Sequence, residues 1–446
     1  MTDAPITWKP PATFDENAPG LGLPQLDGID HRLIYDPKQC RANIDEGGDG
    51  QYESPVHGTF NHHPSIILHD DLFIVTWTNH SRDENGPGQR VLARTGIFAK
   101  NREDIDFGDA LGSMSELAPQ PVPVMRRPFQ HDPHVIYPYA TGALRLINDS
   151  LYFFGNIMAC HGYTNLEENR VPTKPLPADQ WSDDLDVDAG FFFDVWFHLG
   201  LSWVQKWRVH KGRLIPDSAM FRMTPLRTEV EITPGRVKRI AELLPPYTEM
   251  AAFETADAVT RGDVENGTPV SFHRTLKYAP GTVHIAADGL NALAHGAEFR
   301  RPDGSWVVLR DNLLNHGHYY AAEKVAEDDV YPPAVETNLY GGAQMIAGEL
   351  ADGRPWIICN SYDDYFNAAD RSRKDMFLTL SDDGRVFDRT WLLLHVDRTP
   401  DGGVYKFGGP QYFTHVEVGS NIWVVYSITK EQLGITKIPT ALFDAV

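Results

Sequence analysis

The sequence predicts an all-β chain that folds as a β-propeller, with six blades as the first expectation and seven as the alternative. Two observations lead to this prediction. Apolar runs flank short turns of Asn, Asp and Gly residues, which is the pattern of β-hairpins. The hairpins recur along the 446 residues, with turns near positions 70, 149, 303, 352 and 420 and without alternating helices. Recurrent hairpins separated by long loops are typical of propeller blades.

The first hairpin shows the pattern most fully. Residues 60–68 and 72–80 are mostly apolar and flank a short polar turn. Polar residues stand at the outer ends of both strands, with Asn61, His62 and His63 at the start of the first and His80 at the end of the second. The first strand of a propeller blade lines the central channel. We therefore expect these outer ends to face a binding site.

The hairpin spacing also divides the chain. Residues 1–58 are rich in Pro, Gly and Asp and are predicted to form an N-terminal arm, whose strand at 33–35 closes the ring. Residues 59–440 are predicted to form a single propeller domain. The gap between the turns near 149 and 303 leaves room for a sixth hairpin at 250–287. An insertion at about 164–247 is predicted to be partly helical, with helices at 189–209 and 236–244.

Composition narrows the class of partner. The net charge of −21 argues against nucleic acid and against an anionic membrane surface, because the mean field repels phosphates. No apolar run reaches the length of a membrane span, so no membrane partner is expected. Three cysteines lie far apart, and the N-terminus does not look like a signal peptide. These features predict a cytoplasmic protein.

Three segments resemble a known superfamily. Residues 380–387, Leu-Ser-Asp-Asp-Gly-Arg-Val-Phe, look like a shortened Asp-box, the S-x-D-x-G-x-x-W turn of sialidase-like (BNR-repeat) propellers. Residues 423–431 are similar to the last blade of such proteins, and so is the stretch from 350 to Asn360. The resemblance covers roughly residues 58–440 and implies a propeller. The Arg-Ile-Pro motif of true sialidases is absent. In its polar residues the chain is closer to propeller rhamnosidases and to polysaccharide lyases that act at uronic acids.

Histidines and one tyrosine are the predicted catalytic residues. His62, His63 and His161 lie at strand ends, and Tyr412 opens the final blade. A side chain whose pKa is near neutrality suits a general acid or base. Successive side chains of a strand point to opposite faces, so at most one of His62 and His63 is expected to face the channel.

The predicted substrate-binding residues share a position at the start or end of a proposed strand. Fixed polar groups and aromatic faces at such positions suit a sugar. They are Asn61, His80, Arg90, Tyr163, His316, His318, Gln344, Asn360, Tyr362, Arg373 and Gln411. The sequence contains no recognisable metal or nucleotide motif, so no cofactor is expected, with a bound divalent metal left open as an alternative.

These observations predict a carbohydrate-active enzyme that cleaves a glycosidic bond of an oligosaccharide or polysaccharide-derived substrate in a pocket on the propeller axis. Hydrolysis by a glycoside hydrolase needs an acid and a group that activates water, for which Asp311, Asp363 and Glu417 are the carboxylates at strand ends. The alternative is a lyase that acts by β-elimination at a uronic acid, with His or Tyr as base. A non-catalytic glycan-binding propeller is the second alternative.

Overall fold

The computed structural model describes twenty-one stretches of the chain. They are residues 4–38, 58–80, 90–98, 104–107, 114–118, 135–136, 139–147, 150–161, 164–165, 191–192, 195–211, 213–218, 221–222, 286–288, 293–312, 317–327, 329–342, 344–361, 373–400, 406 and 408–444. The chain divides into two compact units. Unit 1 comprises Met1–Leu33, Phe272–Pro400 and Phe407–Val446, and unit 2 comprises Ile34–Ser271 and Asp401–Lys406.

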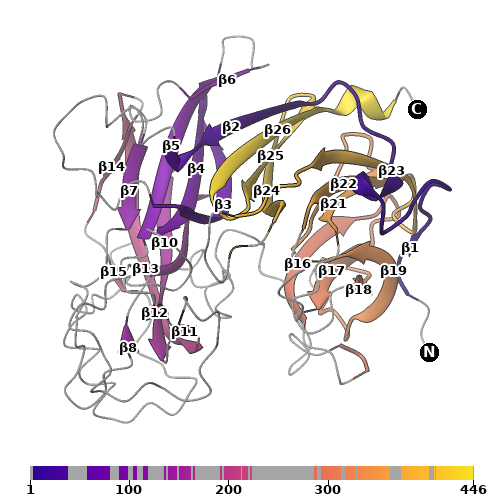
Figure 1. Cartoon of the computed structure of the whole chain (residues 1–446), viewed down its shortest axis with the longest axis horizontal. Helices are drawn as coiled ribbons and strands as arrows, with labels where there is room; N and C mark the ends of the chain where they lie inside the picture. Colours follow the sequence, from indigo (N-terminus) through magenta and orange to yellow (C-terminus); the bar gives the residue numbers. More distant parts are fainter. Residues whose placement is uncertain are drawn as a thin grey trace. The chain divides into compact units, whose positions relative to one another are not determined.

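The described part of unit 1 contains three sheets in chain order, and their consecutive strands pair antiparallel (Figure 1). Within each sheet, consecutive strands are neighbours, so each sheet is a meander. The strands of the first sheet are β16 (Leu293–Arg300), β17 (Trp306–Asn312), β18 (Gly317–Lys324) and β19 (Val335–Gly341). Those of the second are β20 (Ile346–Glu349), β21 (Pro355–Asn360), β22 (Asp375–Ser381) and β23 (Val386–His395). Those of the third are β24 (Pro410–Val418), β25 (Asn421–Ile428) and β26 (Gln432–Pro439).

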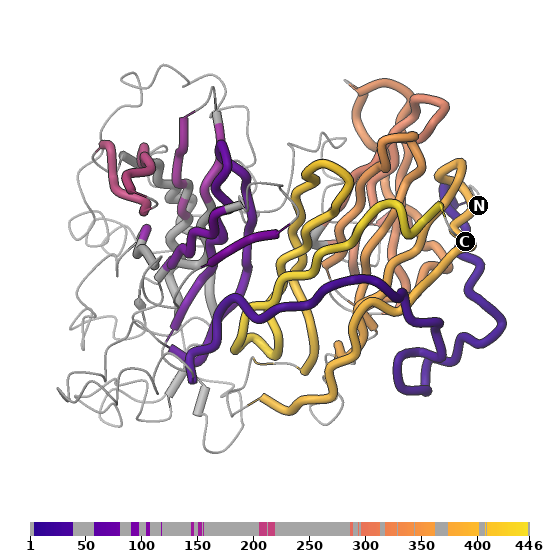
Figure 2. The backbone as a smooth tube through the Cα atoms, turned by 90° about the horizontal axis from the view of Figure 1, so that it is seen from above, coloured from indigo at the N-terminus to yellow at the C-terminus, as the bar shows by residue number. Residues whose placement is uncertain are grey.

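The N-terminal segment supplies outer strands to two of these sheets. β1 (Thr7–Trp8) pairs in parallel with β23, and β2 (Asp30–Tyr35), which contains the strand predicted at 33–35, lies next to β26. Figure 2 shows the indigo N-terminal segment beside the yellow C-terminal strands. Two short 3-10 helices, η1 (Pro19–Gly22) and η6 (Thr440–Phe443), complete the elements of unit 1.

Unit 2 contains two larger sheets and one two-stranded sheet. The first is built from β3 (Phe60–His69), β4 (Leu72–His80), β5 (Arg90–Phe98), β6 (Ile105–Asp106) and β7 (Met114–Ala118). The second is built from β8 (Val135–Ile136), β9 (Tyr139–Ile147), β10 (Ser150–His161), β13 (Val195–His210), β14 (Arg213–Pro216) and β15 (Phe221–Arg222). β11 (Thr164–Asn165) pairs with β12 (Phe191–Phe192).

The all-β prediction is confirmed, and the meanders have the topology of propeller blades. The helix predicted at 189–209 is wrong, because β13 spans Val195–His210 and pairs along its length with β10. Near the C-terminal end of β13, buried Trp207 is followed by exposed Arg208, as expected for a strand, in which successive side chains point to opposite faces. The helix predicted at 236–244 lies outside the described residues, as does the sixth hairpin at 250–287 apart from its last two residues. The blade count therefore stays a prediction.

Apolar side chains fill the space between consecutive sheets of unit 1. Phe299 and Leu309 of the first sheet pack in one cluster with Ile357 and Phe377 of the second. On the other side of the second sheet, Trp356 packs in a cluster with residues of the third sheet. The two central strands of the second sheet, β21 and β22, thus bury both faces, which explains their nearly continuous apolar runs.

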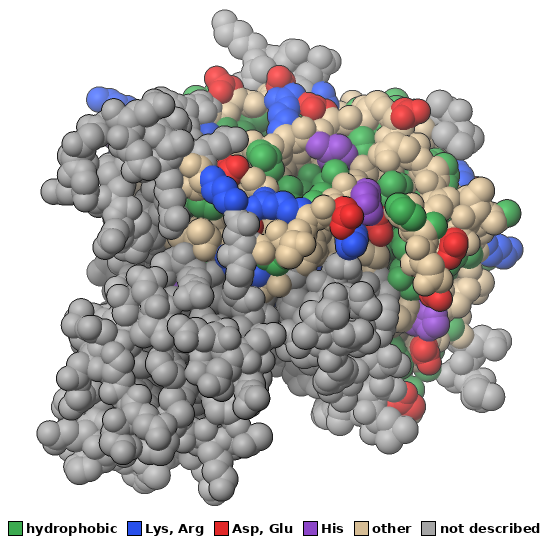
Figure 3. Space-filling view, viewed as in Figure 1, with side chains coloured by type: hydrophobic (Ala, Val, Ile, Leu, Met, Phe, Trp, Pro, Cys, Tyr) green, Lys and Arg blue, Asp and Glu red, His purple; other side chains and the backbone are tan. Residues whose placement is uncertain are grey.

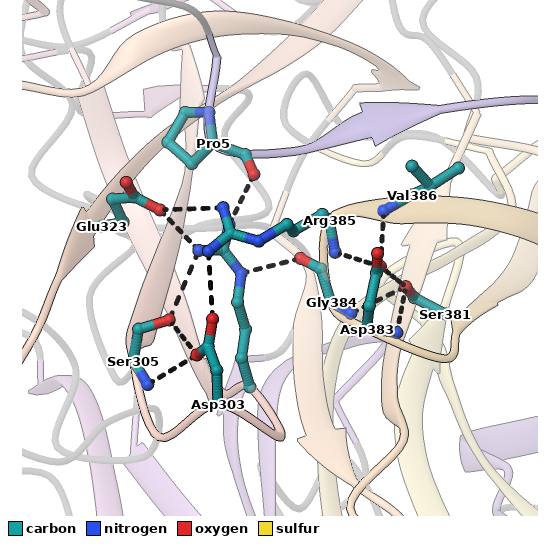
Figure 4. Close-up of polar contacts among 10 residues, drawn as sticks. Pro5, Asp303, Ser305, Glu323, Ser381, Asp383, Gly384, Arg385 and Val386 are labelled. Carbon is teal, nitrogen blue, oxygen red and sulfur yellow. Dashed lines mark hydrogen bonds and ion pairs between the residues drawn. The ribbon is translucent and has the colours of Figure 1, made fainter.

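A buried arginine ties the N-terminal segment to two hairpin turns. The Arg301 side chain is fully buried and donates from Nε to Gly384 O at 3.1 Å and from its terminal nitrogens to Pro5 O at 2.5 Å and Glu323 Oε2 at 2.5 Å (Figure 4). The Gly384 turn is itself held by hydrogen bonds to Ser381 and Asp383, in the segment that resembles an Asp-box. Arg301 therefore joins the first sheet, the second sheet and the start of the chain.

Other charged side chains lie at the surface. Acidic and basic side chains are interspersed on the described part of the face in Figure 3. Arg385, for example, is half exposed and pairs with the exposed Asp303 at 3.0 Å. Hydrogen bonds from the Ser305 side chain and backbone, followed by the contact with Arg385, lower the pKa of Asp303 to about 2. Exposed ion pairs of this kind contribute little to stability.

Truncating Arg301 should therefore destabilise the fold far more than truncating Arg385. We expect Arg301→Ala to lower the free energy of unfolding by about 3 kcal/mol, because it leaves buried acceptors without their charged donor. Arg385→Ala, the matched control, should cost less than about 1 kcal/mol. Urea unfolding followed by tryptophan fluorescence measures both. Equal midpoints for the two variants would contradict the role assigned to Arg301.

A histidine between the second and third sheets should make stability depend on pH. His415 packs edge-on against Trp356, with ring centroids 4.8 Å apart, and burial lowers its pKa to about 4. Below the ordinary histidine pKa of about 6.5, His415 binds a proton in the unfolded chain but stays neutral in the folded chain. Stability from this residue is therefore complete above pH 6.5 and is lost as the pH falls towards 4. His415→Gln should flatten that part of the stability profile, by up to about 3 kcal/mol at pH 4. Thermal unfolding of both proteins between pH 4 and 8 checks this, and parallel profiles would refute it.

Candidate functional site

The meander places particular residues at one end of each sheet in unit 1. The first and third strands of a sheet begin at this end, and the second and fourth strands finish there. We call it the polar end, because polar residues are buried there. They are Asp311, Asn312, Gln344, Asn360, Arg373, Asp375, Gln411 and Ser427.

Four of the larger sheets contain a strand that is bulged near its start. In β24, Tyr412 and Phe413 stand opposite Tyr426 alone, and in β16 two residues stand opposite Asp311 alone. Unit 2 has the same feature in β3, where His63 and Pro64 stand opposite Trp77, and in β9, where Ala140 is the extra residue. A bulge interrupts the alternation of a strand and redirects a side chain, and bulges are common next to active sites.

Two of the predicted catalytic residues occupy equivalent positions in these bulges. His63 has φ of 48° and Tyr412 has φ of 59°, so both adopt the left-handed conformation. For a residue with a Cβ atom this conformation costs about 1–2 kcal/mol. Both side chains are partly exposed, although their chain neighbours His62 and Gln411 are fully buried. The strain therefore accompanies exposure of an imidazole and a phenol, and strained residues of this kind cluster at functional sites.

Two cations flank the Tyr412 ring. Arg373 Cζ lies 5.6 Å and Lys430 Nζ lies 5.8 Å from its centroid, and both of these side chains are buried. Arg373 also donates to Gln411 Oε1 at 3.1 Å, which fixes the guanidinium beside the first strand of the third sheet. This arrangement favours negative charge close to the phenol.

Gln344 and Asn360 lie beside each other at the polar end of the second sheet. Ile346 pairs with Ile358, and Gly342 N donates to Asn360 O at 3.3 Å. Gln344 lies between these two contacts along the chain and is therefore close to Cys359 and Asn360. Both amide atoms of Gln344 and Oδ1 of Asn360 are buried and have no hydrogen-bond partner among the described residues.

The third sheet adds a second buried pair. Gln411 of β24 stands opposite Ser427 of β25, and Ser427 Oγ has no hydrogen-bond partner in the described part of the chain. Asn360 Nδ2 reaches Pro410 O, the residue next to Gln411, at 3.4 Å. Polar ends of the second and third sheets are thus in contact, and they form one site that contains Gln344, Asn360, Arg373, Gln411 and Tyr412.

In unit 2, Asn61 has a structural role. Its Oδ1 accepts from Trp77 Nε1 at 2.9 Å and from Asn79 Nδ2 at 2.8 Å, and its own Nδ2 donates to Gly58 O at 3.0 Å. The side chain is fully buried. This network holds the start of β3 against the end of β4, so the amide of Asn61 is engaged within the sheet. Its predicted substrate contact stays a prediction.

The two histidine rings of β3 do not point to opposite faces, so that expectation is wrong. Their centroids are 4.0 Å apart. The bulge at His63 breaks the alternation on which the expectation rested and brings its ring back beside His62. His62 is fully buried and His63 is partly exposed, so His63 is the more accessible of the pair.

The remaining predicted residues are placed unevenly. His80 is buried at the end of β4, and His318 is about half exposed on β18, where it pairs with Glu336 at 3.2 Å. Arg90 opens β5 and His161 ends β10, but only their backbone positions are described. Tyr163, His316 and Tyr362 lie outside the described residues.

The acidic groups of unit 1 include two that sequence reasoning missed. Asp375 opens β22; burial raises its pKa, although it accepts a hydrogen bond from His395 at 2.6 Å. Glu431 precedes β26, is buried and pairs with Arg398 at 2.6 Å. Their position at strand starts was the available signal. Glu417 lies near the turn at the opposite end of its strand, so it does not belong to the polar end. Asp363 lies outside the described residues.

The sequence allows a bound divalent metal as an alternative to the expected absence of a cofactor. Within the described residues, no group of three or more His, Cys, Asp or Glu side chains is placed to hold a metal ion. The described helices likewise include none long and apolar enough to cross a membrane.

The chain matches no family model and no curated protein. Solved structures with a similar course include a protein of unknown function from Dyadobacter fermentans, with 11% identity over 93% of this chain and 99% of that one and a TM-score of 0.46. An α-L-arabinofuranosidase from Podospora anserina in complex with cellotriose has 10% identity, coverage of 92% and 96%, and a TM-score of 0.35. The sialidase of Trypanosoma rangeli has 8% identity, coverage of 87% and 56%, and a TM-score of 0.42.

Proposed function

We propose that this chain is a carbohydrate-active enzyme that cleaves a glycosidic bond, and that its substrate binds at the polar end of unit 1. The observation that carries the proposal is Tyr412. Its backbone is held in a strained conformation in a bulge, its ring is partly exposed, and two buried cations flank it. A strained, charge-flanked phenol beside buried amides suits chemistry on a ligand rich in hydroxyl groups.

Hydrolysis is the first reaction class. Tyr412 would act at the reacting centre through its ionised oxygen, as a nucleophile or as a proton acceptor, and Arg373 and Lys430 would stabilise the negative charge of that oxygen. The amides of Gln344 and Asn360 would fix the sugar. Asn360 and Tyr412 belong to strands, and the other residues of the set lie two residues from a strand end. The sheets therefore hold the set on a rigid scaffold, as precise positioning of a substrate requires.

Elimination at a uronic acid is the second candidate, and the same two cations favour it. A uronate carboxylate beside Arg373 would be neutralised, which makes the neighbouring carbon–hydrogen bond more acidic, and Tyr412 would remove that proton. The products separate the two reactions, because elimination leaves a double bond that absorbs ultraviolet light. A panel of neutral and uronate-containing glycans, followed by reducing-end release and by absorbance, would show which reaction occurs. If no glycan in the panel is cleaved, the enzymatic proposal is wrong.

Removing the hydroxyl of Tyr412 should abolish most of the activity without weakening the fold. We expect Tyr412→Phe to lower kcat/KM by about 100-fold or more, because the oxygen takes part in the reaction. Tyr426→Phe is the matched control from the same sheet. The Tyr426 hydroxyl is buried and hydrogen-bonds to Thr436 Oγ1 at 3.0 Å, so its loss should lower the unfolding midpoint and leave turnover intact. Turnover that survives Tyr412→Phe would contradict the assignment.

His63 of unit 2 is the catalytic residue that the sequence predicts, and this prediction is tested independently of the site in unit 1. Asn tolerates the left-handed backbone of this position and lacks the imidazole. We expect His63→Asn to lower turnover by about 100-fold with little change in the unfolding midpoint. His62→Asn, which alters a fully buried ring, should instead lower the midpoint. The two variants are compared by glycan cleavage and thermal unfolding, and full activity of His63→Asn would exclude His63 from the chemistry.

A further inference from the structure

Three buried polar groups at the polar end of unit 1 lack partners, and this group carries a specific inference about the ligand. Gln344, Asn360 and Ser427 are each fully buried. Gln344 Oε1 and Nε2, Asn360 Oδ1 and Ser427 Oγ make no hydrogen bond to any residue that the structure describes. Buried polar groups are normally hydrogen-bonded, because leaving one unsatisfied costs free energy. Four such atoms in one region of two adjacent sheets therefore point to a group from outside the fold.

The chemistry of these atoms restricts what that group can be. Gln344 Oε1 and Asn360 Oδ1 accept hydrogen bonds and cannot donate, whereas Ser427 Oγ can do either and Gln344 Nε2 only donates. A ligand that satisfies all four must donate at least two hydrogen bonds and accept at least one. A carboxylate or a fully ionised phosphate donates none, so it would leave both amide oxygens unsatisfied. Neighbouring hydroxyl groups each donate and accept, and they match the set.

We propose that Gln344, Asn360 and Ser427 form a subsite that binds two neighbouring hydroxyl groups of a neutral sugar. Gln344 Nε2 donates to one hydroxyl oxygen, while Gln344 Oε1 and Asn360 Oδ1 accept from the two hydroxyl groups. Ser427 completes the set from the third sheet. The contact between Asn360 Nδ2 and Pro410 O at 3.4 Å holds the two sheets together at this point. This inference rests on the proposed function for its sugar, but it concerns binding and not the reaction.

The experiment couples one ligand hydroxyl to one protein side chain. Neutral aldopentoses and aldohexoses are titrated into the full-length protein by calorimetry, and the sugar that binds is then compared with its monodeoxy analogues. We expect at least one deoxy analogue to bind about tenfold more weakly to the wild type. Gln344→Met, which has a similar shape and no hydrogen-bonding atoms, should bind the parent sugar about tenfold more weakly and should no longer distinguish it from that analogue.

A second test variant and a control variant complete the experiment. Ser427→Ala removes a single oxygen and repeats the cycle if Gln344→Met fails to fold. Thr379→Val is the control, because the Thr379 hydroxyl is buried in the same sheet but is hydrogen-bonded to Thr390 Oγ1 at 2.9 Å. It should lower the unfolding midpoint and leave sugar affinity unchanged. Loss of an unsatisfied group should instead leave the midpoint of the Gln344→Met protein unchanged or raise it.

Each outcome decides the inference. Affinity and deoxy discrimination that are unchanged in Gln344→Met would overturn it and would mean that ordered water satisfies these atoms. Absence of binding by every sugar in the panel would overturn it as well. A sugar that binds with the expected coupling but is never turned over as a glycoside would support the subsite and contradict the proposed enzyme. Cleavage of a glycan that is indifferent to Gln344→Met would do the reverse.

Discussion

The bulges near the starts of β24 and β3 are the constraint on which the exposure of Tyr412 and His63 depends. In a regular antiparallel hairpin, Tyr412 would alternate with Gln411 and would be held by the register of β25. The extra residue places Tyr412 in a left-handed conformation, partly exposed, while Gln411 stays buried and available to Arg373. The same displacement occurs at His63 in unit 2. The same backbone irregularity in β24 and β3 thus exposes a phenol and an imidazole at positions that would otherwise belong to the core.

The strain at these bulges is tolerated because packing and hydrogen bonds hold the surrounding sheets in place. In unit 1, each sheet of three or four consecutive strands packs an apolar face on its neighbour, and Arg301 fastens the turn at the far end to the N-terminal segment. A cost of about 1–2 kcal/mol for a left-handed residue is small beside the burial of side chains such as Trp356 and Phe377. Rigidity at the turn end therefore allows irregularity at the polar end.

Sequence periodicity could predict the sheets but not the bulges. The apolar residues on both sides of the turns at 303, 352 and 420 reflect which positions of each strand are buried. This pattern belongs to a single strand, so the sequence predicts these hairpins. A bulge depends on how two strands pair, and nothing in Gln-Tyr-Phe-Thr distinguishes it from a regular strand. For that reason the expectation that His62 and His63 face apart was wrong, and the sequence does not show that the amide of Asn61 is engaged by Trp77 and Asn79. Long β13 was mistaken for a helix, because its pairing with β10 decides its structure and the pairing partner is remote in sequence.

The buried amides show most clearly why composition alone could not define the site. Gln344, Asn360 and Gln411 all carry side-chain amides at or near strand ends, and nothing in the sequence distinguishes them. In the fold, Gln411 accepts from Arg373, whereas Asn360 uses only its Nδ2, and Gln344 uses neither of its polar atoms, within the described residues. A polar group that is buried and satisfied stabilises the fold, and one that is buried and unsatisfied weakens it unless something else binds there. It is this difference in bonding, at positions of the same residue type, that separates the scaffold of the site from the part that can hold a ligand.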